Sequence, residues 1–328
     1  MMTLRAGLIG LGMMGRHHAR VLSGLDGVEL VAVADMGGDP HGVAGGRPVL
    51  GDIDALVASG IDYCVVAVPT ALHETVALTL AAAGVHALIE KPLSFDTASA
   101  ERIVAAFESA GLVGAVGHIE RYNPALQEAR RRLEAGDLGD IYQIATRRQG
   151  PFPARIADVG VVKDLATHDI DLTAWVSGSA FRTVAAQVAH RSGREHEDLV
   201  AVTGSLENGT VTSHLVNWLS PLKERVTVII GERGALVADT LTADLTYFEN
   251  GTIATTWGEI AQFRGVSEGN VTRFAIAKPE PLLSEHQAFR DAILGKPSDI
   301  VTLAQGLSTV RVAEAVLESA ETNQTITL

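Results

Sequence analysis

A glycine-rich turn near the N-terminus is the clearest chemical motif in the chain. Its residues have the spacing G-x-G-x-x-G and are Gly10, Leu11, Gly12, Met13, Met14 and Gly15. One glycine permits a tight turn, the next lets a pyrophosphate approach the backbone, and the last lets the following helix pack closely on the strand. The N-terminus of that helix then offers free N–H groups to phosphate oxygens. The motif predicts a dinucleotide site, and the alternative is an ordinary strand-to-helix turn.

Asp35 indicates which dinucleotide would bind. It stands 20 positions after Gly15, at the end of the next apolar run. A carboxylate there accepts hydrogen bonds from the adenosine ribose hydroxyls and repels a 2′-phosphate. No arginine occupies positions 36 to 38, where one would bind that phosphate. NAD is therefore predicted as the cofactor, in preference to NADP.

Lys91 and His168 are the candidates for proton chemistry. Lys91 comes just after the apolar run Ala87–Ile89, at the carboxyl edge of a predicted sheet, where ligands bind in such sheets. Its ammonium can hydrogen-bond an alcohol and stabilise the developing alkoxide. The imidazole of His168 titrates near neutral pH, which suits a general base. The alternatives are a surface lysine beside a turn and a core or capping histidine.

Asp164 stands four residues before His168. If a helix begins there, both side chains share one face, so Asp164 could contact substrate or tune His168. The alternative is a helix N-cap, which aspartate favours. Asp169 and Asp171 add two more carboxylates, but they point to other helix faces, so we predict no metal site.

A second group of polar residues follows the last predicted strand of the first domain. Arg121 could bind a phosphate or a sugar oxygen, and Asn123 a hydroxyl; their alternatives are a surface ion pair and a helix cap. A basic stretch, suited to a diphosphate or to a solvated loop, follows at Arg147, Arg148, Arg155 and Lys163. No partner is evident for His190, His196, His214 or His286.

The elements that position these residues alternate between strand and helix. The apolar runs that read as buried strands are Leu4–Ile9, Glu29–Ala34, Tyr63–Val68, Ala87–Ile89 and Val113–Val116. The helical patterns between them are His17–Ser23, Leu72–Ala83 and Ala98–Ala110. This order predicts an α/β fold, a Rossmann domain with a doubly wound parallel sheet over residues 1–118.

The pattern changes in residues 119–328, which we predict to form a substrate-binding and oligomerisation domain. Helices are predicted at Pro124–Ala135, Leu165–Val176, Leu282–Leu294 and Leu303–Ala320. Strand-like runs lie between Phe181 and Trp257, with Asn208-Gly209 and Asn250-Gly251 as hairpin turns. The second domain is therefore predicted as α+β with an open, mostly antiparallel sheet, and Gly265–Pro281 as irregular.

Composition limits the classes of partner. A net charge of −13 over 328 residues argues against a nucleic-acid binder, because phosphates need a basic surface. The single cysteine, Cys64, allows no internal disulfide and suits a reducing cytoplasm. No run of 18 or more apolar residues predicts a membrane span, and glycines interrupt the apolar start too often for a signal peptide.

Several motifs, taken together and in this order, resemble the glucose–fructose oxidoreductase / inositol dehydrogenase family (Gfo/Idh/MocA). They are the glycine run with Arg16-His17-His18-Ala19, Val68-Pro69-Thr70 with His73, Glu90-Lys91-Pro92, and Asp164 with His168-Asp169-Ile170-Asp171. The resemblance implies that Lys91, Asp164 and His168 are catalytic and that the Lys91–Pro92 peptide is cis. It places Pro69, Thr70, His73, Glu90 and Lys91 at the cofactor. It also implies a homodimer or homotetramer formed through the second sheet.

A narrower resemblance suggests the substrate. Residues 117–124, 150–153 and 158–161 are similar to the branch of the family that oxidises UDP-N-acetylglucosamine at C3. We therefore predict an NAD-dependent dehydrogenase acting on a CH–OH group (EC 1.1.1) of a sugar or nucleotide sugar. Lys91, Arg121, Asn123, Arg155, Asp164 and His168 are the predicted substrate contacts. The alternatives are an inositol or free-sugar dehydrogenase, an enzyme acting on a C=C or imine bond, and a non-catalytic NAD-binding regulator.

Overall fold

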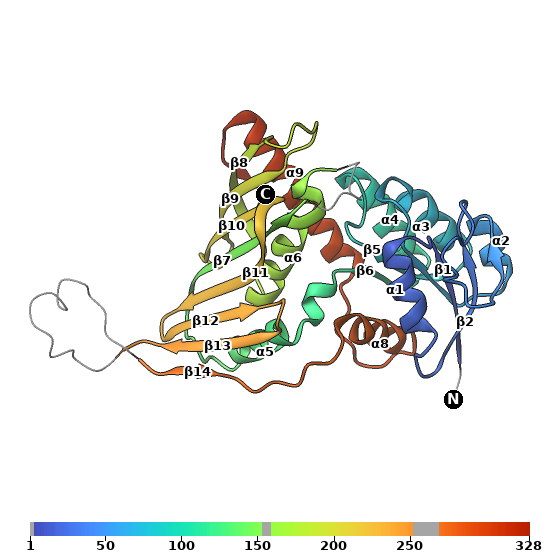
Figure 1. Cartoon of the computed structure of the whole chain (residues 1–328), viewed down its shortest axis with the longest axis horizontal. Coiled ribbons are helices and arrows are strands. Elements are labelled where there is room, and N and C mark those ends of the chain that lie inside the picture. Colours follow the sequence, from blue (N-terminus) through green and yellow to red (C-terminus); the bar gives the residue numbers. More distant parts are fainter. Residues whose placement is uncertain (1–2, 153–158, 252–268) are drawn as a thin grey trace, which may run out of the picture. The chain divides into compact units, whose positions relative to one another are not determined.

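The computed structural model describes residues 3–152, 159–251 and 269–328. The chain divides into two compact units (Figure 1). Unit 1 comprises Met1–Ile119 and Pro279–Glu314, and unit 2 comprises Glu120–Lys278 and Ala315–Leu328. No described helix is both long and apolar enough to cross a membrane.

Unit 1 contains a six-stranded sheet in the order β3-β2-β1-β4-β5-β6. The strands are β1 (Leu4–Ile9), β2 (Val28–Ala34), β3 (Val49–Leu50), β4 (Tyr63–Val66), β5 (His86–Glu90) and β6 (Gly114–Gly117). All neighbouring strands are parallel. The chain runs outward from β1 in one direction and then restarts beside β1 with β4, so the strand order reverses between β1 and β4. This confirms the predicted doubly wound parallel sheet, and in such sheets ligands bind where the strand order reverses, here at the carboxyl ends of β1 and β4.

Helices cover both faces of this sheet, because successive strand residues point to opposite sides. Those of unit 1 are α1 (Met13–Leu22), α2 (Ile53–Ala58), the 3₁₀ turn η1 (Thr70–Leu72), α3 (His73–Ala82), α4 (Thr97–Ser109), α8 (Pro281–Ile293) and the first part of α9 (Leu303–Thr322). On β4, Tyr63 and Val65 join the core beneath α1 and α8, whereas Cys64 and Val66 join the core beneath α3 and α4. The sequence of β4 is continuously apolar because the strand is buried on both faces of the sheet.

Helix α8 and the first part of α9 belong to the first unit, although residues 119–328 were predicted to form one domain. The reason is packing on the first core: Phe289 of α8 meets Tyr63 of β4 edge to face, with ring centroids 5.5 Å apart. Leu307 and Val310 of α9 join the cluster beneath α3 and α4. An amphipathic pattern shows that a helix has a buried face but does not show which core receives it.

Some element boundaries also differ from those predicted. Helix α1 begins at Met13 rather than at His17, because Gly15 weakens the helical pattern of its first turn without preventing it. Strand β3 and helix α2 were not predicted, since they span only two and six residues. Asp52 caps α2 by accepting the N–H of Ala55 at 2.8 Å.

Unit 2 is built on a nine-stranded sheet in the order β14-β13-β12-β11-β7-β10-β9-β8-β15. The strands are β7 (Ile141–Pro151), β8 (Phe181–Ala189), β9 (Leu199–Leu206), β10 (Val211–Asn217), β11 (Leu219–Gly231), β12 (Gly234–Asp239), β13 (Asp244–Glu249), β14 (Val271–Arg273) and β15 (Ile326–Thr327). The β7–β10 pair is parallel and the other neighbouring pairs of described strands are antiparallel, which confirms the predicted α+β architecture. Asn208-Gly209 joins β9 to β10 as the predicted hairpin turn.

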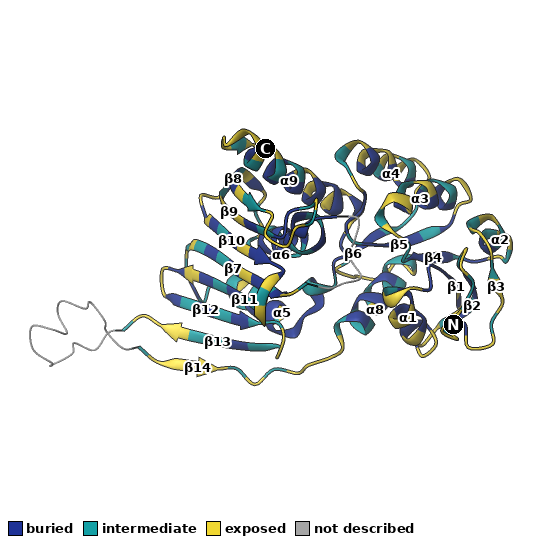
Figure 2. Cartoon of the chain, turned by 45° about the horizontal axis from the view of Figure 1, so that its top comes forward, coloured by how far each residue is buried: buried dark blue, intermediate teal, exposed yellow. Residues whose placement is uncertain are grey.

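Short helices cover one face of the second sheet (Figure 2). They are η2 (Ile119–Tyr122), α5 (Pro124–Glu134), the π-helix η3 (Val162–Ala166) and α6 (Thr167–Ser177). Leu126 of α5 and Leu172 of α6 pack with Ile144 of β7 and Ile229 of β11. Strand β14 lies within Gly265–Pro281, so the prediction of an irregular segment is wrong there; residues 265–268 lie outside the described part.

Candidate active site

The glycine turn of unit 1 lies where β1 meets β4. Gly10 has φ +94°, and a Cβ on it would lie 2.4 Å from the carbonyl oxygen of Ala67, so only glycine fits this approach. A Cβ on Gly15 would lie 1.9 Å from the carbonyl oxygen of Gly10. By contrast, a Cβ on Gly12 would meet nothing within 4 Å. Gly10 and Gly15 are therefore needed for packing, while Gly12 leaves open space above the backbone.

Helix α1 begins immediately after that open position. Among the described residues, no side chain caps its N-terminus, and its first turn contains no acidic residue. The N–H groups of this turn can therefore hydrogen-bond an anion, which the helix dipole also favours.

Asp35 follows β2 at the same edge of the sheet and is half-buried. Its Oδ2 accepts the N–H of Leu11 at 2.7 Å, and its Oδ1 accepts the N–H of Gly37 at 2.7 Å. Each carboxylate oxygen can accept a second hydrogen bond, so the side chain is held in place and can still bind ribose hydroxyls. Together with the open Gly12 and the uncapped helix, this arrangement fits a dinucleotide.

The end of β4 leads into η1 through Pro69 and Thr70, which are exposed and half-buried respectively. His73 is buried instead, with Nε2 3.0 Å from the carbonyl oxygen of Val68 and Nδ1 2.9 Å from that of Pro92. Burial lowers the pKa of His73, which favours the neutral ring, and a neutral imidazole donates through only one of its nitrogens. These contacts favour a role in holding the turn after Lys91 over the predicted direct contact with the cofactor.

Lys91 lies one residue after β5, at the carboxyl edge of the sheet, and is half-buried. The Lys91–Pro92 peptide is cis, as the family resemblance implies. The backbone N–H of Lys91 donates to Oε2 of Glu90 at 3.1 Å. Glu90 itself is only 8% exposed, so its carboxylate needs partners within the protein.

Those partners form a buried polar chain that the sequence analysis missed. Oε1 of Glu90 lies 2.8 Å from Nε2 of His18, and Nδ1 of His18 lies 2.8 Å from Nε2 of His286. Glu285 is buried beside this chain. A signal was present for His18: it falls on the buried face of α1 with Gly15, Ala19 and Leu22, where a histidine requires a partner.

In unit 2, Asp164 and His168 occupy one irregular helical segment. Asp164 lies in the π-helix η3 and is 7% exposed, while His168 lies in the first turn of α6 and is half-buried. Asp164 is not an N-cap, because η3 begins at Val162. A π turn is wider than an α turn and rotates less per residue, so side chains four apart lie closer to one line. The segment thus places both side chains along the same side of the helix.

Two buried ion pairs fix the rest of α6. Arg148 of β7 donates from Nε to Asp169 and from Nη1 to Glu120, both at 2.9 Å. Burial alone would lower the pKa of Arg148, but the two carboxylates outweigh it and raise the pKa. Arg121 donates to both oxygens of Asp171, from Nε at 2.8 Å and from Nη2 at 2.6 Å. These contacts favour a role for Arg121 in positioning α6 over the predicted contact with a substrate.

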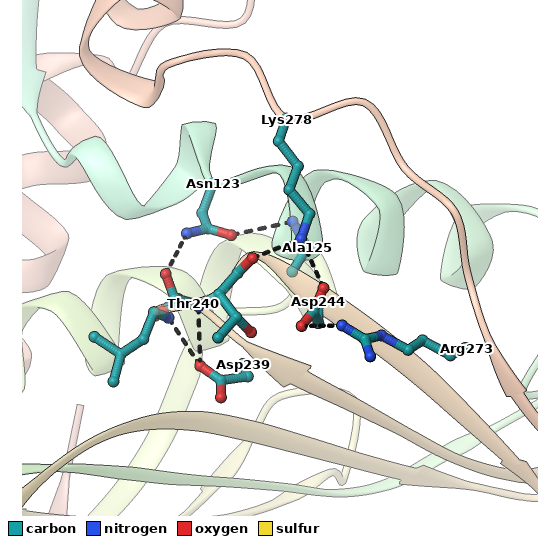
Figure 3. Close-up of polar contacts among 9 residues, drawn as sticks. Asn123, Ala125, Asp239, Thr240, Asp244, Arg273 and Lys278 are labelled. Carbon is teal, nitrogen blue, oxygen red and sulfur yellow. Dashed lines mark hydrogen bonds and ion pairs between the residues drawn. The ribbon is translucent and has the colours of Figure 1, made fainter.

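Asn123 is the N-cap of α5 (Figure 3). Its Oδ1 accepts the N–H of Ala125 and its Nδ2 donates to the carbonyl oxygen of Thr240, both at 3.0 Å. The amide therefore joins α5 to the β12–β13 turn, which favours the capping alternative.

Two members of the predicted basic stretch can be followed further. Arg147 pairs with Glu224 at 2.8 Å on the sheet, and Arg155 lies outside the described residues.

Two family descriptions match the chain over these units. Residues 4–118 match the oxidoreductase family with an NAD-binding Rossmann fold, and residues 126–237 match the GFO/IDH/MocA C-terminal domain. Together they cover more than half of the 328 residues. The chain belongs to this family. The predicted family is confirmed, and so is the predicted cofactor, because the matched family is NAD-binding.

Individual GFO/IDH/MocA relatives differ in substrate. UDP-N-acetylglucosamine 3-dehydrogenase of Acidithiobacillus ferrooxidans is 33% identical over 65% of this chain and 66% of its own length. Inositol 2-dehydrogenase 4 of Saccharopolyspora erythraea is 33% identical over 55% of this chain and 56% of its own. The alignments therefore span less than two thirds of these relatives.

Similarity in structure extends over nearly the whole chain. The solved structure of UDP-N-acetylglucosamine 3-dehydrogenase GnnA from Acidithiobacillus ferrooxidans superposes with a TM-score of 0.87 and 27% identity, over 98% of this chain and 99% of that one.

In the described part of the chain, no group of three or more histidine, cysteine or acidic residues is arranged to hold a metal ion.

Proposed function

We propose that this protein is an NAD-dependent dehydrogenase that oxidises a secondary ring hydroxyl of a sugar. The observation that carries the proposal is the position of Lys91. It follows β5 at the carboxyl edge of the Rossmann sheet, two strands from the glycine turn, and a buried carboxylate holds its backbone N–H. A cation fixed at this edge is suited to a negative charge that develops on a substrate oxygen.

NAD, when bound, supplies the nicotinamide ring that accepts a hydride. Gly12 and the first turn of α1 would receive the pyrophosphate, and Asp35 would receive the ribose hydroxyls of the adenosine. Lys91 would donate a hydrogen bond to the hydroxyl oxygen and stabilise it as the proton leaves. His168 would take that proton as general base, with Asp164 beside it on the same helical segment.

The substrate that we propose is UDP-N-acetylglucosamine, oxidised to its 3-keto form. The motifs at residues 117–124, 150–153 and 158–161 support this choice, as does the likeness to the Acidithiobacillus ferrooxidans enzyme. The similarly distant inositol 2-dehydrogenase supports a second candidate, an inositol or a free sugar. A screen of NAD reduction against nucleotide sugars, inositols and free sugars distinguishes them.

Two other functions predict different results in that screen. A non-catalytic NAD-binding regulator would bind NAD and reduce none with any sugar. An enzyme acting on a C=C or imine bond would leave all alcohols unoxidised but would oxidise NADH with an unsaturated substrate. The presence of Lys91, Asp164 and His168 together supports the dehydrogenase, because each has a role in removing a proton from an alcohol.

The decisive variant is Lys91→Met, which removes the ammonium and keeps most of the side-chain length. We expect turnover to be abolished while the Kd for NAD, measured by fluorescence titration, remains near the wild-type value. Lys296→Met is the matched control, because Lys296 is an exposed lysine of unit 1 whose ammonium pairs with Asp291. Near-normal turnover by Lys91→Met would refute the mechanism.

The open face of the second sheet supports the proposal of a homodimer or homotetramer. Val211, Leu215 and Ile230 are exposed apolar residues of β10 and β11, and the strand register places them on the face opposite Ile144 and Ile229 of the core. A cluster of exposed apolar residues on one sheet face is typical of a protein–protein contact.

A further inference from the structure

The buried chain that ends at Lys91 links three separate elements of unit 1. His18 comes from α1, the helix that begins at the glycine turn; Glu90 ends β5; and His286 comes from α8. Helices α1 and α8 lie side by side (Figure 1). Through Nε2, His18 therefore connects α1 to Glu90, the residue that precedes the proposed catalytic lysine, and through Nδ1 it connects α1 to α8.

The direction of each hydrogen bond follows from the chemistry of Glu90. The pKa of Glu90 lies below its ordinary value: burial raises it, but the hydrogen bonds and charges of His18 and Lys91 together outweigh the burial. An ionised carboxylate only accepts, so His18 must carry a hydrogen on Nε2 and donate it to Oε1. The other oxygen, Oε2, accepts the N–H of Lys91 at 3.1 Å. One carboxylate thus receives a donor from α1 and a donor from the Lys91 backbone.

Few other hydrogen-bond donors could replace His18 at the Glu90 carboxylate. The side chain of His18 is fully buried, and that of Glu90 is 11% exposed, so little water can replace the lost donor. Glu285, also buried nearby, adds an acidic group whose two oxygens have no hydrogen-bond partner among the described residues. Burial, and with it the charge of Glu90, raises the pKa of Glu285, which favours its protonated form. Loss of the His18 donor would leave Glu90 to protonate or to turn away.

We propose that His18 is a positioning residue for Lys91: by holding the Glu90 carboxylate, it fixes the backbone at the start of the Lys91–Pro92 turn. The inference rests on the proposed function of Lys91. His286 completes the arrangement. Its Nε2 forms a hydrogen bond with Nδ1 of His18, and this contact fixes the plane of the His18 ring. The residue acts through Glu90 and need not touch either substrate or cofactor.

The test compares His18→Leu, His18→Gln and the control His17→Leu. Leucine fills similar space without a donor, whereas glutamine keeps a donor for Glu90. His17 is the exposed neighbour on the same helix. The first measurement is hydrogen exchange of the Lys91 amide, resolved by NMR, with Leu88 in the interior of β5 as internal reference. The second is kcat, with KM and the Kd for NAD.

We expect His18→Leu to speed exchange of the Lys91 amide relative to that of Leu88. Its kcat should fall roughly tenfold to a hundredfold, because small misplacements of a catalytic group cost about that much. The Kd for NAD should stay within about twofold of wild type, since the contacts at Gly12 and Asp35 are unchanged. His18→Gln should restore both exchange and kcat, and His17→Leu should resemble the wild type.

Two results would overturn the inference. One is wild-type exchange at Lys91 in His18→Leu; the other is an equal loss of kcat and NAD affinity that glutamine does not restore. The exchange measurement needs no substrate, so it decides the role of His18 even when wild-type protein oxidises no sugar, a result that would refute the proposed function alone. If His18→Leu does not fold, imidazole ¹⁵N spectra of the wild type decide: a His18 hydrogen on Nδ1 alone overturns the assignment.

Discussion

Replacing Asp171 with asparagine tests whether Arg121 serves the fold of unit 2 or a substrate. The Arg121 and Asp171 side chains are 6% and 1% exposed, and the guanidinium reaches both carboxylate oxygens. Removing one member of a buried pair leaves the other charge without compensation, which costs about 3–5 kcal/mol. We expect Asp171→Asn to lower the free energy of unfolding by about that amount.

Urea unfolding followed by tryptophan fluorescence measures this loss where it occurs. All three tryptophans, Trp175, Trp218 and Trp257, fall within residues 120–278, so the signal reports on unit 2. Glu134→Gln is the control, because Glu134 is 63% exposed in its pair with Arg130 on α5. Its effect should be a small fraction of that of Asp171→Asn, since exposed pairs contribute little.

A double variant separates the charge from the packing. Arg121→Met with Asp171→Leu removes both charges and keeps apolar volume, so it should recover part of the stability that Asp171→Asn loses. The reasoning fails if Asp171→Asn costs no more than Glu134→Gln. In that event the guanidinium does not depend on Asp171, and the predicted contact of Arg121 with a substrate regains its basis.

Two further predictions concern unit 1. Glu285→Gln should stabilise the protein increasingly as pH rises above 4.5, the ordinary pKa of the group, because folded Glu285 keeps a proton that the unfolded chain releases. The gain in unfolding free energy is at most about 1.4 kcal/mol per pH unit, is absent at acidic pH and levels off above the pKa of folded Glu285. Urea unfolding of the variant and the wild type at several pH values measures this gain. A difference between the two proteins that does not change with pH would contradict the prediction. Gly15→Ala should lower Tm, because its Cβ would lie 1.9 Å from the carbonyl oxygen of Gly10, whereas Gly12→Ala should keep Tm and weaken NAD binding. Equal Tm losses in the two variants would contradict this distinction.

The Rossmann half was predictable because its signals are local. The glycine spacing, Asp35 and the apolar runs lie within a short stretch of chain, and each has one physical reading in that order. The second sheet was predictable in type from its turns but not in strand order. Strands β7 and β10 pair in parallel although four described elements, η3, α6, β8 and β9, lie between them, and no local pattern fixes such a pairing.

The side-chain networks were not predictable from the sequence. His18 and His286 are 268 residues apart, so their contact depends on where α8 packs. In the sequence, Arg148 belongs to a basic stretch suited to a diphosphate or a solvated loop, and Asp169 has no evident partner. In the structure the two side chains form a buried ion pair. The π turn at Val162–Ala166 was also missed, because one extra residue in a helical turn leaves the apolar pattern nearly unchanged.

The late return of α8 to unit 1 has a consequence for how this chain can be divided. A fragment ending at residue 118 would contain every strand of the nucleotide-binding sheet but would lack the helix that covers Tyr63. The apolar surface beneath α8 would face water, and His18 would lose its neighbour His286. The nucleotide-binding half is therefore not a contiguous cassette. Exchanging it between relatives requires a transplant with three splice sites, near residues 119, 279 and 314.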